Sequence, residues 1–336
     1  MKIAYIIRPH SVLAGRFDGI RSQAITWGCA LVGKGHEVDY IDNWGNYDWS
    51  SYDVVHFFGN GSWVNAIRAH LSKMNDRFVY SPIYDPSPFL ESKSQYIQKK
   101  ISKFTHGKWY CALYDVCREY HGYKKILVRN EYESEMIQHL FDVPKNIIVK
   151  VPLSYSHILN YEDNLPMKEN FVFHMSLFTQ PRKNVIRLVK AAQKYGFKLK
   201  IAGYPGTEDA YKEFMEVVNN APNIEILGFV SEEEKKDLYR RAKVFALPSI
   251  NEGVGIVAVD AALYGDDIVV TNIGGPKEYY NGMAEIVNPY SVDEIGQACI
   301  RLLNGKTYQP ELRKYIRENY SLDVIADKLI SVYKTL

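Results

Sequence analysis

The fold is decided by the stretch VFALPSINEGVGIVAVDAALYG, which runs from Val244 to Gly265. Its first residues are apolar and predict a buried strand that ends at Pro248-Ser249. Gly253 and Gly255 follow, and a glycine lets the backbone come close to a ligand because it has no side chain. A helix is predicted to begin near Gly255, and its free N–H groups and positive dipole end would form a site for phosphate oxygens.

Two acids accompany this turn. Glu252 stands at the entrance of the predicted helix, and Asp260 lies inside it, with seven residues between the two. A plain strand-to-helix turn with a capping glutamate would give a similar local pattern. The neighbouring sequence fits a longer pattern, which favours a ligand site over that structural alternative.

On both sides of this segment short β-rich runs alternate with helical stretches, which predicts a parallel α/β architecture. The polar stretch 155–170 has no clear period and predicts a linker. We therefore expect two doubly wound, Rossmann-like domains, one over 1–155 and one over 168–320. Ligands of such sheets sit beyond the carboxyl ends of the strands, so loops that follow the strands should line a cleft between the domains.

The composition is that of a soluble globular protein, with 46% hydrophobic and 24% charged residues. The formal net charge of +2 gives no overall basic field of the kind that nucleic-acid-binding proteins use. The four cysteines form no CxxC pair, which suggests neither a zinc site nor a disulfide framework. The apolar run 3–7 is too short for a signal-peptide core or a membrane span, so we expect a cytoplasmic protein.

The segment around Glu252 resembles the signature of family 4 glycosyltransferases, in which P-S-x-x-E-G-x-G carries the first acid of an E-x7-E pair. Further motifs of that family follow in the same order through the second half of the chain. They are Ile201-Ala202-Gly203, Leu227-Gly228-Phe229-Val230-Ser231, Leu238-Tyr239-Arg240-Arg241-Ala242 and Gly274-Gly275-Pro276-Lys277-Glu278. The first half matches more loosely, through Asp18-Gly19-Ile20-Arg21, Lys34-Gly35-His36-Glu37-Val38 and Asp53-Val54-Val55-His56.

The resemblance implies a GT-B fold, with an acceptor-side first domain and a donor-binding second domain facing each other across a cleft. The terminal segment 321–336 resembles a helix that in such enzymes packs back on the first domain. The implied activity is the retaining, metal-independent transfer of a sugar from a nucleotide-sugar donor to a glycan or lipid-linked acceptor. Neither a cofactor nor an essential metal ion is expected, and no convincing D-x-D motif occurs.

The resemblance also implies roles for individual residues. Glu252 would contact donor-sugar hydroxyls near the reacting carbon, and Asp260 would accept hydrogen bonds from the ribose. Lys183 would neutralise the diphosphate, whose negative charge grows in the transition state. The remaining candidates for the donor side are Gly19, Arg182, Phe229, Gly253, Val254, Gly255 and Ile256.

Three departures from the family stand out. The usual G-R-L is replaced by His174-Met175-Ser176-Leu177, so an arginine is missing, and Arg182 is a candidate to supply its charge. Tyr84 occupies the position of a histidine that commonly lies beside the donor sugar. The second acid of the pair is the aspartate Asp260. Tyr84, Asp85 and His56 are the candidates for the acceptor side, although His56 could equally be a satisfied histidine at a strand end.

The stretch KSQYIQKKISKFTHGKWY, 93–110, is basic and aromatic, with Ile97, Ile101 and Phe104 at helical spacing. Such a helix could lie on an anionic membrane, in keeping with a lipid-linked acceptor and a peripheral position at the inner face of the membrane. The alternative, which we favour from the sequence, is a surface helix whose apolar stripe packs on the sheet.

Other classes remain open. A nucleotide-sugar epimerase, or a non-catalytic nucleotide-sugar-binding protein, could share the scaffold. A phosphorylase would need a cofactor lysine context that is not seen. A Rossmann oxidoreductase is disfavoured because the first loop lacks a clean G-x-G-x-x-G.

Overall fold

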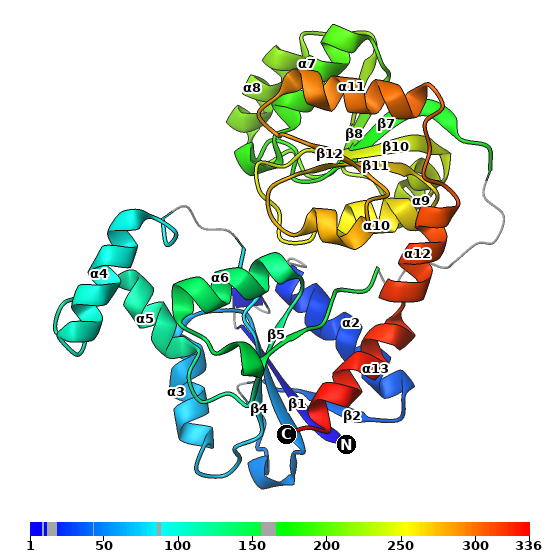
Figure 1. The fold of residues 1–336 in the computed structure, drawn as a ribbon. Coiled ribbons are helices and arrows are strands. Elements are labelled where there is room, and N and C mark those ends of the chain that lie inside the picture. Colours follow the sequence, from blue (N-terminus) through cyan, green and yellow to red (C-terminus); the bar gives the residue numbers. More distant parts are fainter. Residues whose placement is uncertain (9, 12–18, 43, 86–88, 156–165) are drawn as a thin grey trace. The chain divides into compact units, whose positions relative to one another are not determined.

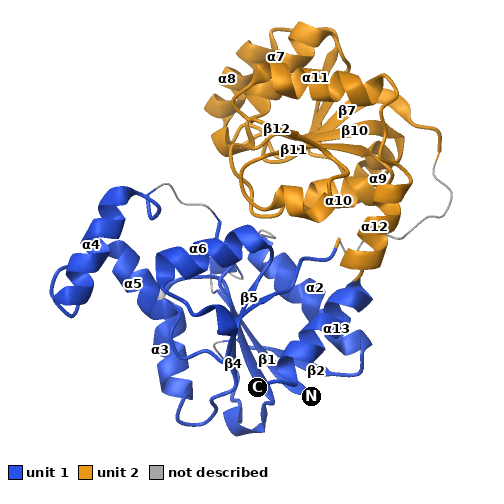
Figure 2. Ribbon diagram, viewed as in Figure 1, with its two compact units in different colours: residues 1–154, 322–336 blue, residues 155–321 orange. Residues whose placement is uncertain are grey.

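The computed structural model describes residues 1–336 except 9, 12–18, 43, 86–88 and 156–165. The chain divides into two compact units, shown in Figure 2: residues 1–154 with 322–336, and residues 155–321. Each unit is built on a six-stranded sheet in which all of the strand pairs are parallel. The predicted class, two Rossmann-like α/β domains, is confirmed.

The sheet of unit 1 has the strand order β2-β1-β3-β4-β5-β6. Its strands are β1 (Lys2–Ile7), β2 (Glu37–Tyr40), β3 (Val54–Phe58), β4 (Phe78–Ser81), β5 (Lys125–Val128) and β6 (Ile148–Lys150). Its helices are α2 (Gly19–Gly33), α3 (Ser62–Leu71), α4 (Lys93–Phe104), α5 (Ala112–Glu119), α6 (Glu131–Phe141) and α13 (Leu322–Tyr333).

Strand β1 shows how this unit forms. Successive side chains of a strand point to opposite faces of the sheet. Ile3 and Tyr5 therefore join the core under α2 and α13, while Ala4 and Ile6 join the core under α3, α5 and α6. The last helix of the chain, α13, thus completes the layer that α2 begins on one face of the sheet (Figure 1).

The sheet of unit 2 has the order β12-β11-β10-β7-β8-β9. Its strands are β7 (Glu169–Met175), β8 (Leu199–Ala202), β9 (Ile224–Gly228), β10 (Ala242–Leu247), β11 (Asp267–Thr271) and β12 (Glu285–Val287). Its helices are α7 (Val185–Tyr195), α8 (Glu208–Val218), α9 (Glu232–Arg241), α10 (Ile256–Leu263), α11 (Val292–Leu303) and α12 (Glu311–Tyr320).

Several helix ends follow from local sequence. Ser231 caps α9, and its hydroxyl and the Glu234 side chain form a reciprocal capping box. Gly196 ends α7 in the left-handed conformation that only glycine adopts without a steric penalty. Helices α7, α8 and α11 pack on one face of the sheet, around Val172 and Val244.

One expectation about packing is wrong. The apolar stripe of α4 does not pack on the sheet, since Ile97, Ile101 and Phe104 are all exposed. The helix packs against α5 instead, and its buried residues are Gln95, Lys99 and Ser102. None of the helices in the described part of the chain, α4 included, has the length and apolar character of a membrane span.

Candidate functional site

The site is built at the carboxyl end of β10, which lies between β7 and β11 in the sheet of unit 2. Leu247 ends the strand, Ser249 is fully buried, and α10 begins at Ile256. Gly255 forms the N-cap of α10 with a φ of 72°. A Cβ at Gly255 would lie 2.7 Å from Leu247 Cδ2, so both the conformation and the space require glycine here.

The backbone of Glu252 is fixed by a second loop, the Gly-Gly turn after β11. Glu252 forms a parallel bridge with Gly274, and the Gly275 N–H donates to the Glu252 carbonyl oxygen at 3.3 Å. Gly274 has a φ of 89°, and a Cβ there would lie 2.2 Å from that oxygen. The two glycine-bearing motifs of the sequence therefore meet at this one glutamate.

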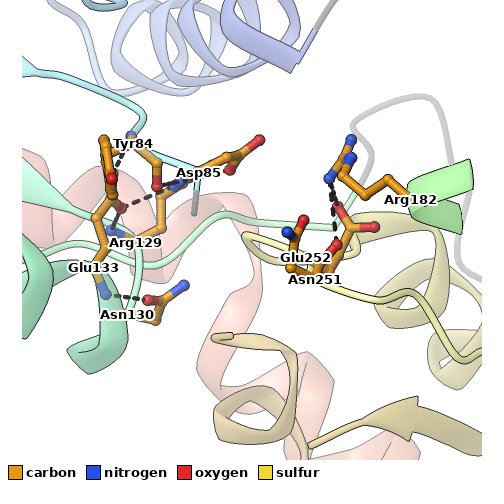
Figure 3. A network of polar contacts seen from close by, with 8 residues as sticks. All are labelled: Tyr84, Asp85, Arg129, Asn130, Glu133, Arg182, Asn251 and Glu252. Atoms are coloured by element: carbon orange, nitrogen blue, oxygen red, sulfur yellow. Dashed lines mark hydrogen bonds and ion pairs between the residues drawn. The ribbon is translucent and has the colours of Figure 1, made fainter. Parts of the chain in front are cut away.

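The carboxylate of Glu252 lies between two cations. Lys183 Nζ donates to Glu252 Oε2 at 2.7 Å, and Arg182 Nη1 donates to Oε1 at 3.3 Å, as Figure 3 shows for the arginine. The Ser249 hydroxyl donates to Oε2 at 3.2 Å. The side chain of Glu252 is 9% exposed and that of Lys183 is 15% exposed, so water screens this pair only in part.

The cations are held in place by the short turn Pro181–Lys183, which follows β7. Asn184 closes this turn in the left-handed conformation, and its Nδ2 donates to the carbonyl oxygens of Pro248 and Pro289 at 2.8 and 2.7 Å. The Ile250 N–H donates to the Arg182 carbonyl oxygen at 2.8 Å. The cationic turn and the loop with Glu252 are thus joined by backbone and buried side-chain hydrogen bonds.

His174 lies under this turn, at the end of β7, and is fully buried. Its Nδ1 donates to the Ala246 carbonyl oxygen at 2.7 Å, so Nε2 accepts from the Ser176 hydroxyl at 2.7 Å. Burial lowers the pKa of His174 to about 4, and the ring is therefore neutral at pH 7. At the position of the missing family arginine this chain supplies no positive charge.

The other donor-side candidates are placed differently. Gly253 and Val254 are buried in the turn, whereas Phe229, after β9, is 83% exposed. Asp260 lies on α10 and is only 4% exposed. Gly19 is exposed at the first position of α2, in unit 1.

In unit 1 a buried ion pair organises the segment after β4. Arg129 Nε donates to Glu133 Oε2 at 2.9 Å, and Arg129 Nη2 donates to the Tyr84 carbonyl oxygen at 2.7 Å and to Asp85 Oδ1 at 3.1 Å (Figure 3). Glu133 Oε1 accepts from the Tyr84 N–H at 2.6 Å. Asp85 keeps 47% of its side chain exposed, so its carboxylate is positioned by Arg129 yet accessible.

Two of the acceptor-side candidates, Tyr84 and His56, have buried side chains. The Tyr84 side chain is 3% exposed, its ring packs edge-on against Phe141, and its hydroxyl donates to Glu91. His56 lies within β3, fully buried, with Nδ1 2.7 Å from the Tyr333 hydroxyl and Nε2 2.8 Å from the Ser81 hydroxyl. Both side chains belong to the interior of unit 1, because Phe141 at the end of α6 packs on Tyr84 and Tyr333 of α13 contacts His56.

Sequence reasoning missed the residues that hold the candidates in place. The sequence marks Ser249 only as the end of a strand and as part of the P-S-x-x-E-G-x-G pattern, although Glu252 lies three residues further on. Asn184 gave no signal, because its partners Pro248 and Pro289 are distant in sequence. The Arg129–Glu133 pair did leave one, an arginine at the end of a strand followed at i+4 by a glutamate on the next helix. Among the described residues, no three His, Cys, Asp or Glu side chains are grouped so as to hold a metal ion.

The chain thus consists of two doubly wound α/β units, and the second carries an acid and two cations at the ends of its strands. Residues 160–321 match the sequence model of the family described as Glycosyl transferases group 1. The chain is 26% identical over 260 residues to the uncharacterized glycosyltransferase MJ1607 of Methanocaldococcus jannaschii, an alignment that covers 69% of this chain and 64% of the relative. It is 25% identical over 202 residues to the O-antigen chain mannosyltransferase B of Escherichia coli, covering 55% and 53%. The chain thus spans about half to two thirds of the length of these relatives.

Solved structures show the same fold. A sucrose-phosphate synthase from Thermosynechococcus elongatus superposes with a TM-score of 0.77 at 15% identity, covering 100% of this chain and 99% of the other. Anabaena Alr3699/HepE, solved in complex with UDP, superposes with a TM-score of 0.74 at 15% identity, covering all of both chains. The chain therefore has the two-domain, Rossmann-like fold of these structures, and its match to the Glycosyl transferases group 1 model covers residues 160–321.

Proposed function

We propose that this protein transfers a sugar from a nucleotide-sugar donor to a hydroxyl-bearing acceptor, a glycan or a lipid-linked glycan. The observation that carries the proposal is the cluster of Glu252, Lys183 and Arg182 at the strand ends of unit 2. A leaving nucleoside diphosphate needs cations, and a donor sugar needs a buried hydrogen-bond acceptor for its hydroxyls. The UDP complex of the HepE structure supports a nucleotide donor by analogy.

In the proposed reaction the donor C1–O bond to the diphosphate breaks, and a bond forms between C1 and an acceptor oxygen. The hydroxyl proton of the acceptor leaves with the diphosphate or to water. Lys183 and Arg182 stabilise the charge that grows on the diphosphate, while Glu252 orients the sugar through its hydroxyls. The Gly253, Val254 and Gly255 backbone lies next to Glu252 and would approach the same ligand, with Ile256 beginning α10 behind it.

Because Glu252 neutralises the two cations in the structure, the donor phosphates would compete with it for Lys183 and Arg182. The proposed test uses Glu252→Gln, which removes the charge and keeps the shape of the side chain. Release of nucleoside diphosphate from nucleotide sugars should be lost. Binding of free nucleoside diphosphate, measured by calorimetry, should be retained or tighten by roughly fivefold, as for loss of about 1 kcal/mol of ion pairing.

Finer features belong to the same proposal. Membership of family 4, with Glu252 and Asp260 as its acid pair, predicts retention of anomeric configuration, which proton NMR of the fresh product checks. Independence from divalent metal ions predicts undiminished turnover in EDTA. A lipid-linked acceptor would place a cytoplasmic protein at the inner face of the membrane.

The second candidate is a non-catalytic nucleotide-sugar-binding protein, or an epimerase on the same scaffold. The neutral His174 and the buried Tyr84, in place of an arginine and a histidine of the family pattern, favour this alternative. A thermal-shift screen separates binding from catalysis, because a true donor stabilises the fold by mass action. Stabilisation by a nucleotide sugar with no diphosphate released in any acceptor mixture would reject the transferase and retain the binding protein.

A further inference from the structure

Helix α4 is folded with its polar face inward. Lys99 Nζ donates to the Leu140 carbonyl oxygen at 2.6 Å and lies 2.9 Å from Asp142 Oδ1. The Ser102 hydroxyl donates to the Trp109 carbonyl oxygen at 2.6 Å. Gln95 Oε1 accepts from the Leu113 N–H at 3.3 Å. These hydrogen bonds satisfy the buried polar groups, so the orientation of the helix is fixed by specific partners.

The apolar stripe of α4 is consequently left on the outside. Ile97, Ile101 and Phe104 follow one another at i, i+4 and i+7, and are 59%, 41% and 86% exposed. Trp109 and Tyr110 continue the apolar character in the turn after the helix, at 56% and 74% exposure. A surface helix normally buries such a stripe against the core of its own domain. The exposed stripe of α4 is therefore suited to contact an apolar medium or a partner.

Positive charge surrounds the stripe. Lys93, Lys100, Lys103 and Lys108 are exposed, and no acid occurs in the sequence between Glu91 and Asp115. Lys100 Nζ lies over the Tyr96 ring, 4.8 Å from its centroid, and Lys103 is 3.7 Å from Asp142. On the helical wheel the stripe therefore has lysines along one border, whereas the whole chain carries a net charge of only +2.

We propose that this α4 surface docks on an anionic lipid bilayer. The surface consists of Tyr96, Ile97, Ile101, Phe104, Trp109 and Tyr110 with Lys93, Lys100, Lys103 and Lys108. The apolar stripe enters the boundary between headgroups and acyl chains, the aromatic side chains lie at headgroup level, and the lysines meet anionic headgroups. A second copy of the chain is the weaker occupant, because a symmetric pairing of the stripe would bring its lysines together.

The position of α4 in unit 1 fits this use. The helix is attached through α5, and α5 in turn contacts α3 and α6, so α4 lies at the outer end of this layer (Figure 1). Insertion of its stripe would disturb none of the sheet packing. Docking through α4 would bring the protein to a lipid-linked acceptor. This role in acceptor binding rests on the proposed function, whereas the docking itself does not.

The test is sedimentation of the full chain with vesicles of phosphatidylglycerol and phosphatidylcholine in equal parts, compared with pure phosphatidylcholine. Wild type should bind only the anionic vesicles, more weakly at high salt. Ile97→Gln with Phe104→Gln should reduce binding about tenfold or more. Its control is Trp44→Gln, which removes a 94% exposed aromatic of unit 1 and should leave binding unchanged.

The charge contribution is tested separately. Lys100→Gln with Lys103→Gln should reduce binding about fivefold for each lysine. The exposed pair Lys73→Gln with Lys145→Gln changes the net charge equally and should have a small effect. Because all of these side chains are exposed, far-UV circular dichroism and diphosphate release in solution should match wild type.

Absence of wild-type binding to anionic vesicles at low salt would overturn the proposal, as would equal binding to both vesicle types. A dimer in ultracentrifugation that the Ile97/Phe104 variant dissociates, without vesicle binding, would assign the stripe to a second copy and reject the membrane. Specific vesicle binding by a chain that releases no diphosphate supports the α4 surface and counts against the transferase.

Discussion

At the scale of single residues, the arrangement around Glu252 depends on charges that would be costly if unpaired. The carboxylate is nearly enclosed, and removal of its cationic partners would leave a buried charge without compensation. Lys183 and Arg182 are neighbours in the turn after β7, and the side chains of both contact the Glu252 carboxylate. The site is thus charged before any ligand arrives, and a diphosphate would exchange one anion for another.

Lys183→Ala should mainly lower kcat of the proposed reaction. Loss of one preorganised group that stabilises developing charge typically costs about 2.7–4 kcal/mol, or a factor of roughly 10²–10³ in rate. Steady-state kinetics with a nucleotide-sugar donor measures this. The exposed helix lysine Lys190, replaced by alanine, is the control and should change kcat little. Equal kinetics for wild type and Lys183→Ala would exclude this lysine from the diphosphate site.

His174 predicts a particular dependence of stability on pH. The folded state keeps the ring neutral down to a pKa of about 4, while the unfolded chain takes up a proton below about 6.5. Stability should therefore fall as pH is lowered from 6.5 to 4, by up to about 3 kcal/mol from this group. Urea unfolding of wild type and His174→Gln should diverge over this window.

The matched control for that experiment is the exposed His70, because its replacement by glutamine should leave the pH profile parallel to wild type. Carboxylates that titrate in the same range affect all three proteins alike and cancel in the differences. Parallel profiles for wild type and His174→Gln would contradict the prediction.

At the scale of elements, the loop between β10 and α10 depends on the turn after β11. Gly274 and Gly282 both have positive φ, 89° and 80°, but only a side chain at Gly274 would collide with backbone, namely the Glu252 carbonyl oxygen. Gly274→Ala should therefore cost more stability than Gly282→Ala, which is expected to cost about 1 kcal/mol from the backbone conformation alone.

Thermal unfolding measures this comparison, and diphosphate release should fall in Gly274→Ala because Glu252 is displaced. Equal melting temperatures for the two variants would show that the bridge between Glu252 and Gly274 does not constrain the loop.

At the scale of the whole molecule, the chain returns to its first unit at the end. Tyr333 on α13 lies 2.7 Å from His56 Nδ1, and its hydroxyl is 3.2 Å from that of Tyr5. These contacts join α13 to β1 and β3, so unit 1 is completed by residues 322–336. The buried hydroxyl of Tyr333 takes part in both contacts, the one with His56 and the one with Tyr5.

Tyr333→Phe should destabilise unit 1 by about 1–3 kcal/mol, because buried polar atoms of His56 and Tyr5 lose a partner. Hydrogen exchange should show faster opening of peptides from β1 and β3, and unchanged exchange in β7 and β10 of unit 2. The exposed Tyr110→Phe is the control. Protection that is unchanged in both units would reject the role assigned to this hydroxyl.

The sequence alone determined the parallel α/β class and the strand, turn and helix around Glu252. Those features are local: strand and helix periods, glycines where the backbone is left-handed, and a serine with its capping glutamate at Ser231. The sequence also pointed to Glu252, Lys183 and Arg182, because the resemblance to a family rests on residue types at fixed spacing.

Which of these residues meet, and which of them are buried, depends on contacts between distant parts of the chain. Lys183 and Glu252 are 69 residues apart in sequence, and their ion pair exists because β7 and β10 are neighbours in the sheet. His56 and Tyr84 are residue types suited to a binding site, but in the structure both are core residues, packed under helices from other parts of the chain. Helix α4 turned its apolar stripe outward because Leu140 and Asp142, some forty residues on, supply partners for Lys99. Burial is a property of such distant contacts, and no local pattern contains it.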